Sequence, residues 1–135
     1  MKQEKPQNPK AKIPEEIKEQ VNKIISEFNA VTFKKNSGIE YYAVYRTGFL
    51  YLNRREGERD GPVARLRYKG SMDTWEFAIF KWSSERYDPD EIFFPGRNQL
   101  NGTIEGALKA GNEAYPPDYN PPPKELFDFI RNLFS

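Results

Sequence analysis

The residues of this sequence best suited to chemistry are cations and large aromatic rings between positions 63 and 82. Binding of nucleic acid on a sheet needs cations for the phosphates and flat rings for the bases. If this stretch forms a hairpin, residues two apart along a strand share a face. One face then carries Arg65, Arg67, Lys69, Phe80 and Trp82. We therefore predict a cation–aromatic face, named here by these five residues, with single-stranded nucleic acid as its candidate ligand.

The predicted hairpin has one register if its turn spans residues 70–73. Pairing Lys69 with Thr74 places Arg67 opposite Glu76. The same register sets Arg65 opposite Ala78 and Val63 opposite Phe80. The other face is apolar throughout and must be the core side; it holds Ala64, Leu66, Tyr68, Trp75, Phe77 and Ile79. Two interpretations of the polar face stay open. Either Arg67 only pairs with Glu76 while a helix covers Phe80 and Trp82, or the face binds a ligand.

Charge is distributed unevenly along a nearly neutral chain. The 21 Lys and Arg residues against 20 Asp and Glu residues give a net charge of +1. Residues 54–69 hold six cations and three anions, whereas residues 71–91 hold two cations and six anions. A neutral protein lacks the overall positive field typical of nucleic-acid-binding domains. Any such interface would therefore have to be local.

Several kinds of site are excluded by composition. The chain has no Cys and no His, which excludes disulfides, zinc fingers, Ser-His-Asp and Cys-His catalysis and His-ligated metals. An acidic cluster remains as a candidate cation or acid–base site; its members are Asp73, Glu85, Asp88, Asp90 and Glu91. Asp-Pro-Asp-Glu at 88–91 is, however, typical of solvated turns. We predict no catalytic residues, no metal and no cofactor.

The sequence divides into a tail, one domain, a connector and a final helix. Residues 1–12 predict a disordered basic tail, 13–114 a single domain, 115–123 a proline-rich connector and 124–135 a C-terminal docking helix. We expect an α+β fold with an N-terminal helix, an antiparallel sheet of four to five strands and one or two C-terminal helices. The predicted core is Ile17, Val21, Ile24, Ile25, Phe28, Leu66, Trp75, Phe77, Ile79, Ile104 and Leu108.

The individual elements follow from periodicity and turn signals. Helical spacing predicts helices over 14–29, with Asn29 at its end, and over 100–114, capped by Asn101 or Thr103. We expect strands at 31–33, 40–46 and 49–53, the last two forming either a hairpin or one bent strand. Residues 54–61 predict a charged loop. Residues 83–99 look irregular, with 92–94 either a short strand or a loop that plugs the core.

The final segment has an apolar face too wide for its length. Leu126, Phe127, Ile130, Leu133 and Phe134 must dock on the same domain or on another chain. A homodimer is therefore one candidate assembly. Residues 116–119 also spell P-P-x-Y, a short polyproline ligand, in a context where such a match arises by composition. No apolar stretch reaches the length that spans a membrane, and no signal peptide is evident. We expect a cytoplasmic protein without a membrane partner.

Two family resemblances rest on short motifs. Residues 62–68 (PVARLRY), 75–77 (WEF) and 86–89 (RYDP) resemble a domain of unknown function in short uncharacterised bacterial proteins, across about residues 15–114. That resemblance implies an architecture and no activity, and this chain lacks the family's W-H-x-Y element. Residues 77–83 (FAIFKWS), followed by the helix at 100–114, are similar to the transcriptional-coactivator p15-like fold. This second resemblance implies a curved four-stranded sheet that binds single-stranded DNA, usually as a dimer.

Three functional hypotheses follow. The leading one is a small non-enzymatic binding or interaction protein, with a homodimer through the C-terminal helix as its candidate assembly. The second is a single-stranded nucleic-acid-binding protein that uses the cation–aromatic face. The third, least favoured, is a carboxylate- or metal-dependent enzyme.

Overall fold

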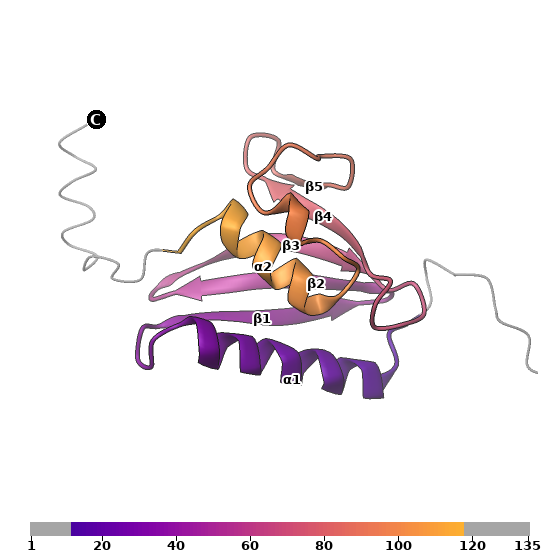
Figure 1. Cartoon of the computed structure of the whole chain (residues 1–135), viewed down its shortest axis with the longest axis horizontal. Coiled ribbons are helices and arrows are strands. Elements are labelled where there is room, and N and C mark those ends of the chain that lie inside the picture. Colours follow the sequence, from indigo (N-terminus) through magenta and orange to yellow (C-terminus); the bar gives the residue numbers. More distant parts are fainter. Residues whose placement is uncertain (1–11, 118–135) are drawn as a thin grey trace, which may run out of the picture.

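Alternating side chains over residues 39–88 build an antiparallel five-stranded sheet with two helices on one side (Figure 1). The computed structural model describes residues 12–117. The strands are β1 (Ile39–Arg46), β2 (Phe49–Glu56), β3 (Arg59–Arg67), β4 (Glu76–Lys81) and β5 (Arg86–Asp88), paired in chain order. The helices are α1 (Glu15–Thr32) and α2 (Ile104–Ala114), with a 3₁₀ turn, η1, at Arg97–Gln99.

This architecture confirms the predicted α+β fold with its N-terminal helix, antiparallel sheet and C-terminal helix. The basic tail up to residue 11, the connector from residue 118 and the docking helix with its apolar face lie outside the described residues. The division of the chain into these parts therefore stays a prediction. The Thr47-Gly48 hairpin is the alternative that the structure adopts between β1 and β2.

Helix α1 is longer than its sequence pattern predicted. Pro14 precedes it in extended conformation, and Glu15 and Glu16 lie in the first turn, where carboxylates favour the positive helix end. The predicted strand at 31–33 is wrong, because the helix continues to Thr32 and the Phe33 N–H bonds to the carbonyl of Asn29. Asn29 does not end the helix. Its side chain instead bonds to the backbone of β1.

The predicted charged loop at 54–61 is also wrong, since β2 and β3 continue through it to a short turn at residues 57 and 58. Charged side chains in this stretch have partners, so the pairing of β2 with β3 can continue through it. The Arg55 guanidinium lies 2.8 Å from a Glu40 carboxylate oxygen on the neighbouring strand. Arg54 is buried, and its Nε donates to Glu56 at 2.9 Å.

The predicted register of the β3–β4 hairpin is confirmed, with Arg67 opposite Glu76 and Arg65 opposite Ala78. The ladder ends at Arg67 and Glu76, so the predicted pair of Lys69 with Thr74 does not form and residues 68–75 connect the two strands. The pairing of Val63 with Phe80 is wrong. Leu52 of β2 pairs with Ala64 and the next residue, Asn53, pairs with Pro62, which leaves Val63 as a bulge. Val63 therefore turns to the helix side and is 3% exposed. There its Cγ1 would lie 2.7 Å from a Cβ placed on Gly111, so α2 approaches the sheet closely at this glycine.

Residues 83–99 are less irregular than predicted, because β5 pairs with β4 within them. After β5 the chain folds back over the sheet, and the ring of Phe94 stacks on that of Phe77 with centroids 5.9 Å apart. Helix α2 begins at Ile104, four residues later than predicted. Thr103 caps it, and the Thr103 hydroxyl oxygen accepts a bond from Gly106 N at 3.0 Å.

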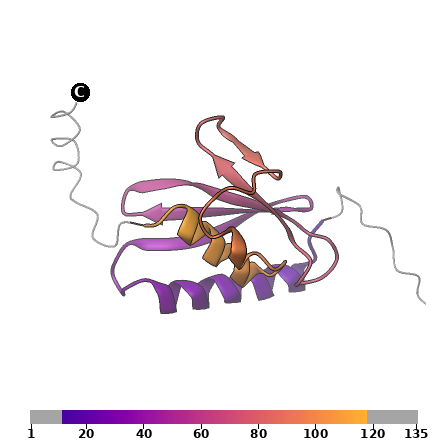
Figure 2. The same ribbon diagram turned by 45° about the horizontal axis from the view of Figure 1, so that its top comes forward.

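The core lies between the sheet and the two helices (Figure 2). The predicted core residues are all buried or half-buried on this side. Leu50 and Leu52 of β2 are fully buried as well, each contributing about 1.5–3 kcal/mol by removal from water. Trp75 is 4% exposed and Trp82 is 57% exposed. The predicted alternation of the hairpin is therefore correct in the residues that test it most directly.

Candidate nucleic-acid interface

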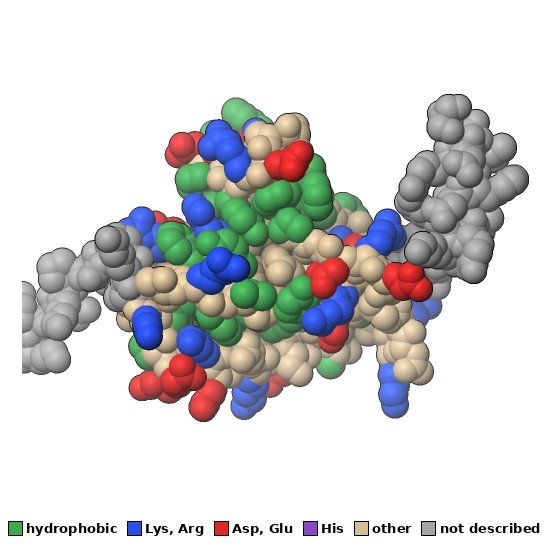
Figure 3. Space-filling model, turned by 180° about the vertical axis from the view of Figure 1, so that it is seen from behind, with side chains coloured by type: hydrophobic (Ala, Val, Ile, Leu, Met, Phe, Trp, Pro, Cys, Tyr) green, Lys and Arg blue, Asp and Glu red, His purple; other side chains and the backbone are tan. Residues whose placement is uncertain are grey.

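Neither α1 nor α2 covers the other side of the sheet (Figure 2). Figure 3 views the molecule from this side and shows hydrophobic side chains gathered over its upper part, with Lys and Arg side chains among them. Residues that pair across antiparallel strands point to the same side. The strand pairing therefore determines which side chains form this uncovered face.

Two rows of side chains run across the strands on the uncovered face. The first row, from β1 to β4, is Arg46, Phe49, Arg67 and Glu76. The second row is Val44, Tyr51, Arg65 and Ala78. Beyond these rows, Phe80 of β4 pairs with Tyr87 of β5. Cations and rings are therefore neighbours both along and across the strands.

Arg65 lies at the centre of this face. Its guanidinium carbon is 4.7 Å from the centroid of the Phe49 ring and 5.5 Å from that of Tyr87. These cation–π contacts hold a long side chain in one place. Arg67 is two residues further along β3, a spacing of about 6.6 Å along a strand. Arg67 therefore leaves the strand on the same face as Arg65.

The rings form a continuous series across β2, β5 and β4. Centroid distances are 6.3 Å from Phe49 to Tyr51, 5.4 Å from Tyr51 to Tyr87 and 5.0 Å from Tyr87 to Phe80. The neighbouring rings are tilted or edge-to-face, so no ring in the series is stacked flat on the next. The four rings are half-buried, and the guanidinium of Arg65 already lies over that of Phe49.

The ion pairs leave the centre of the face positive. At its margins Arg55 pairs with Glu40, and Lys69 lies 3.8 Å from Glu76. Within residues 12–117 no carboxylate forms an ion pair with Arg65 or Arg67. The Nε of Arg67 is buried and has no hydrogen-bond partner there. A negatively charged ligand would supply the ion-pair partner that these two side chains lack among the described residues, although the buried Nε of Arg67 is out of its reach.

Two tyrosines of this face, Tyr42 and Tyr87, have a raised pKa and stay neutral at ordinary pH. Burial raises the pKa of Tyr87, the neighbouring Tyr51 phenol raises it further, and Arg65 opposes both. The hydrogen bond from the Tyr42 hydroxyl to Asp60, 2.7 Å long, raises the pKa of Tyr42. Neutral phenols do not repel phosphates and can donate hydrogen bonds to them.

The structure brings together most of the cation–aromatic face. Arg65, Arg67 and Phe80 lie on the uncovered side as predicted. Lys69 follows the end of β3 and is engaged by Glu76. Trp82 lies in the turn after β4, where its ring packs edge-to-face on Phe80 and over Gly61. Trp82 thus borders the face and also contacts the end of the sheet.

Sequence reasoning missed Phe49, Tyr51 and Tyr87, which supply most of the ring surface. The alternation of ring and non-ring residues over 49–53 was a usable signal, because it puts Phe49 and Tyr51 on one side of a strand. The position of Tyr87 depends on a three-residue strand that the sequence pattern does not show.

The acidic cluster does not come together as one site: Asp73 accepts a bond from Ser71 in the connection before β4, whereas Asp88 and Glu91 form ion pairs with Lys81. Lys81 Nζ lies 2.7 Å from Glu91 and 3.8 Å from Asp88. The hydrogen bond between Lys81 and Glu91 lowers the pKa of the Glu91 carboxyl and raises the pKa of the Lys81 ammonium group. Among residues 12–117 no three acidic side chains converge as a metal site requires.

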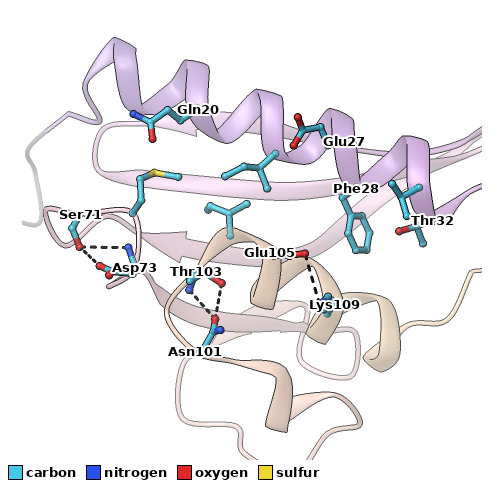
Figure 4. A pocket seen from close by; sticks show the side chains of 14 residues that line it. Gln20, Glu27, Phe28, Thr32, Ser71, Asp73, Asn101, Thr103, Glu105 and Lys109 are labelled. Carbon is cyan, nitrogen blue, oxygen red and sulfur yellow. Dashed lines mark hydrogen bonds and ion pairs between the residues drawn. The ribbon is translucent and has the colours of Figure 1, made fainter.

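A groove of about 1080 Å³ separates the two helices on the other side of the molecule (Figure 4). Its polar side chains bond mainly to one another. Ser71 donates to Asp73, Thr103 donates to Asn101, and Lys109 lies 3.7 Å from Glu105. The groove therefore presents few unpaired groups to a ligand.

In the described part of the chain, no helix has both the length and the apolar character needed to cross a bilayer. Comparison of the chain with protein-family models, with curated proteins and with solved structures finds no match. The two family resemblances drawn from short motifs stay predictions. Function has to be argued from the site alone.

Proposed function

We propose that this chain is a small non-enzymatic binding protein whose uncovered sheet face takes single-stranded nucleic acid. The observation that carries the proposal is the arrangement around Arg65. A guanidinium without a carboxylate partner in the described residues lies between Phe49 and Tyr87, with Arg67 and Tyr51 beside it. Phosphates need the cations, and bases need the rings.

The shape of the surface favours single strands over a duplex. Single-stranded nucleic acid lays its bases flat on exposed rings, at about 1–3 kcal/mol for each stacked base. The grooves of a duplex are instead read by an inserted helix or ribbon. The uncovered face is the broad side of a sheet, and its rings lie in a series rather than on a protruding edge.

A protein partner is the competing ligand for this face, since Trp, Tyr and Arg are also common in protein interfaces. The two guanidiniums with no ion pair in residues 12–117 favour a polyanion instead. The homodimer through Leu126, Phe127, Ile130, Leu133 and Phe134 stays a separate proposal, because those residues lie outside the described range. A cytoplasmic location likewise rests on the sequence alone.

The test is a titration of a fluorescent single-stranded oligonucleotide with the full-length protein at low salt, followed by anisotropy. We expect binding that weakens as salt is added, because phosphate contacts release counterions. Arg65→Ala combined with Arg67→Ala should remove most of it. The matched control is Lys23→Ala combined with Arg97→Ala, which removes two exposed cations from the helix side and gives the same net charge.

Equal binding by the wild type and the Arg65/Arg67 variant would contradict the proposal. So would an equal loss in both double variants, because that result would show a response to net charge alone. Circular dichroism of each variant checks that the fold is retained.

A further inference from the structure

A second exposed apolar surface lies at the end of β4, where Trp82 borders the uncovered face and packs on Phe80. Trp82 is 57% exposed and Phe93 is 87% exposed. Both border a hollow of about 370 Å³ whose floor includes Ile79, Phe94 and Tyr115. Ile92, next to Phe93 in the chain, is 48% exposed. Exposed apolar side chains that border one hollow mark a docking surface. We call Trp82, Phe93 and this hollow the Trp82–Phe93 patch.

The described chain ends at the rim of this patch. Tyr115 follows α2 and is fixed at both ends. Its hydroxyl donates to the carbonyl of Phe80, and its own carbonyl accepts from Arg54 Nη1 at 2.6 Å. Arg54 is itself buried and bonded to Tyr41 and Glu56. The chain beyond Pro117 therefore starts from a rigid point beside Trp82.

We propose that the apolar segment at residues 124–134 of the same chain docks on the Trp82–Phe93 patch. Eight residues lie between Pro117 and Leu126, and the nine residue steps from one to the other would span up to about 28 Å in an extended polyproline conformation. That reach is ample for a surface that begins beside Tyr115. The prolines at 121–123 also limit the conformations of the connector, which lowers the entropy lost on docking.

The chemistry of the two surfaces matches. The segment carries Leu126, Phe127, Ile130, Leu133 and Phe134 at spacings of three and four residues, which gives one apolar side in a helix. The patch offers two large rings around a hollow of suitable size for one of these side chains. Docking removes both rings from water and leaves Arg65, Phe49 and Tyr87 open. This inference does not depend on the proposed function, because it assigns Trp82 to the chain's own segment.

The test uses the full-length protein and acrylamide quenching of its tryptophan fluorescence. Trp75 is buried, so the quenchable signal comes from Trp82. We expect Leu126→Asp combined with Ile130→Asp to raise the quenching constant about twofold or more. The control, Asp128→Ser combined with Asn132→Ser, alters the polar side of the same segment and should leave quenching unchanged. Equal quenching in all three proteins would overturn the proposal.

A second measurement, amide hydrogen exchange, changes the Trp82–Phe93 patch and observes the docked segment. Phe93→Ser should abolish the slow amide hydrogen exchange that docking gives to residues 126–134. Val31→Ser should leave that exchange unchanged, since Val31 is also 87% exposed but lies on α1. No effect of Phe93→Ser would contradict the proposal. Protection that disappears on dilution, together with a dimer mass in sedimentation, would also contradict it, because a second copy would then supply the segment.

Discussion

The guanidinium of Arg65 lies over the ring of Phe49, with 4.7 Å between its central carbon and the ring centroid. The two residues belong to neighbouring strands and to neighbouring rows of the uncovered face. The contact fixes a planar group with several N–H donors in one orientation before any ligand arrives. Such a group binds a phosphate through two parallel hydrogen bonds, at little further cost in side-chain entropy.

This contact predicts that Arg65→Lys weakens oligonucleotide binding although the charge is kept. Lysine lacks the planar fork, and loss of one charge-assisted hydrogen bond costs about 1.5 kcal/mol, or about tenfold in affinity. The control substitution Arg97→Lys, on the helix side, should leave the affinity for the oligonucleotide unchanged. The measurement is the anisotropy titration at one fixed salt concentration. Wild-type affinity in Arg65→Lys would show that charge alone is recognised at this position.

The side chain of Asn29 protects the edge strand β1. Its Nδ2 donates to Tyr41 O at 3.0 Å, and its Oδ1 accepts from Tyr41 N at 2.9 Å. Asn29→Ala should therefore lower the free energy of unfolding by about 1–3 kcal/mol, the value of two hydrogen bonds, and expose an unpaired edge. Urea unfolding measures the loss. Asn29→Asp keeps only the hydrogen-bond acceptor, so its free energy of unfolding should lie between those of the wild type and Asn29→Ala. An unchanged urea midpoint in Asn29→Ala would refute this role.

Tyr45 should ionise late. Burial raises its pKa to about 12 from 10.0, and its hydroxyl donates to Asn22 at 2.8 Å. Because the folded pKa is the higher one, the stabilisation is complete below pH 10 and is lost as pH rises through about 12. Ultraviolet titration of the phenols should show this ionisation in the wild type and not in Tyr45→Phe. Identical alkaline titration curves for the two proteins would contradict the assignment.

The ion pair of Lys81 with Glu91 should stabilise the protein over a wide range of pH. The pKa of Glu91 is lowered from 4.5 by its bond to Lys81, so its contribution is present above pH 4.5 and is lost as pH falls through the lower folded value. The pKa of Lys81 is raised from 10.5, so its contribution is lost above that pH. Glu91→Gln should therefore be less stable than the wild type at neutral pH and approach it in acid. A stability difference that does not change between pH 7 and acid would count against the pair.

The hairpin of β3 and β4 could be predicted because the alternation of its strands is strict. A slip of one residue would have moved Trp75 outward and Arg65 inward, at a large cost in burial. The bulge at Val63 could not be predicted this way. It depends on the close approach of α2 at Gly111, nearly fifty residues further along the chain.

Arg54 shows why the strand structure at residues 54–61 could not be predicted from the sequence. A charged residue beside Arg55 and Glu56 indicates a solvated loop, yet Arg54 is 8% exposed. Besides Glu56, its partners are the hydroxyl of Tyr41 on β1 and the carbonyl of Tyr115 at the end of α2. Only the folded chain brings these groups together. Tyr87 joined the interface for the same reason, since β5 pairs with β4 over only three residues.

Amide chemical-shift mapping of the full-length protein during titration with a short single-stranded oligonucleotide tests the central claim most directly. The account predicts the largest shifts in β2, β3 and β5, around Tyr51, Arg65 and Tyr87, with small shifts in α1 and α2. Shifts confined to the groove between the helices, or none at saturating oligonucleotide, would contradict it.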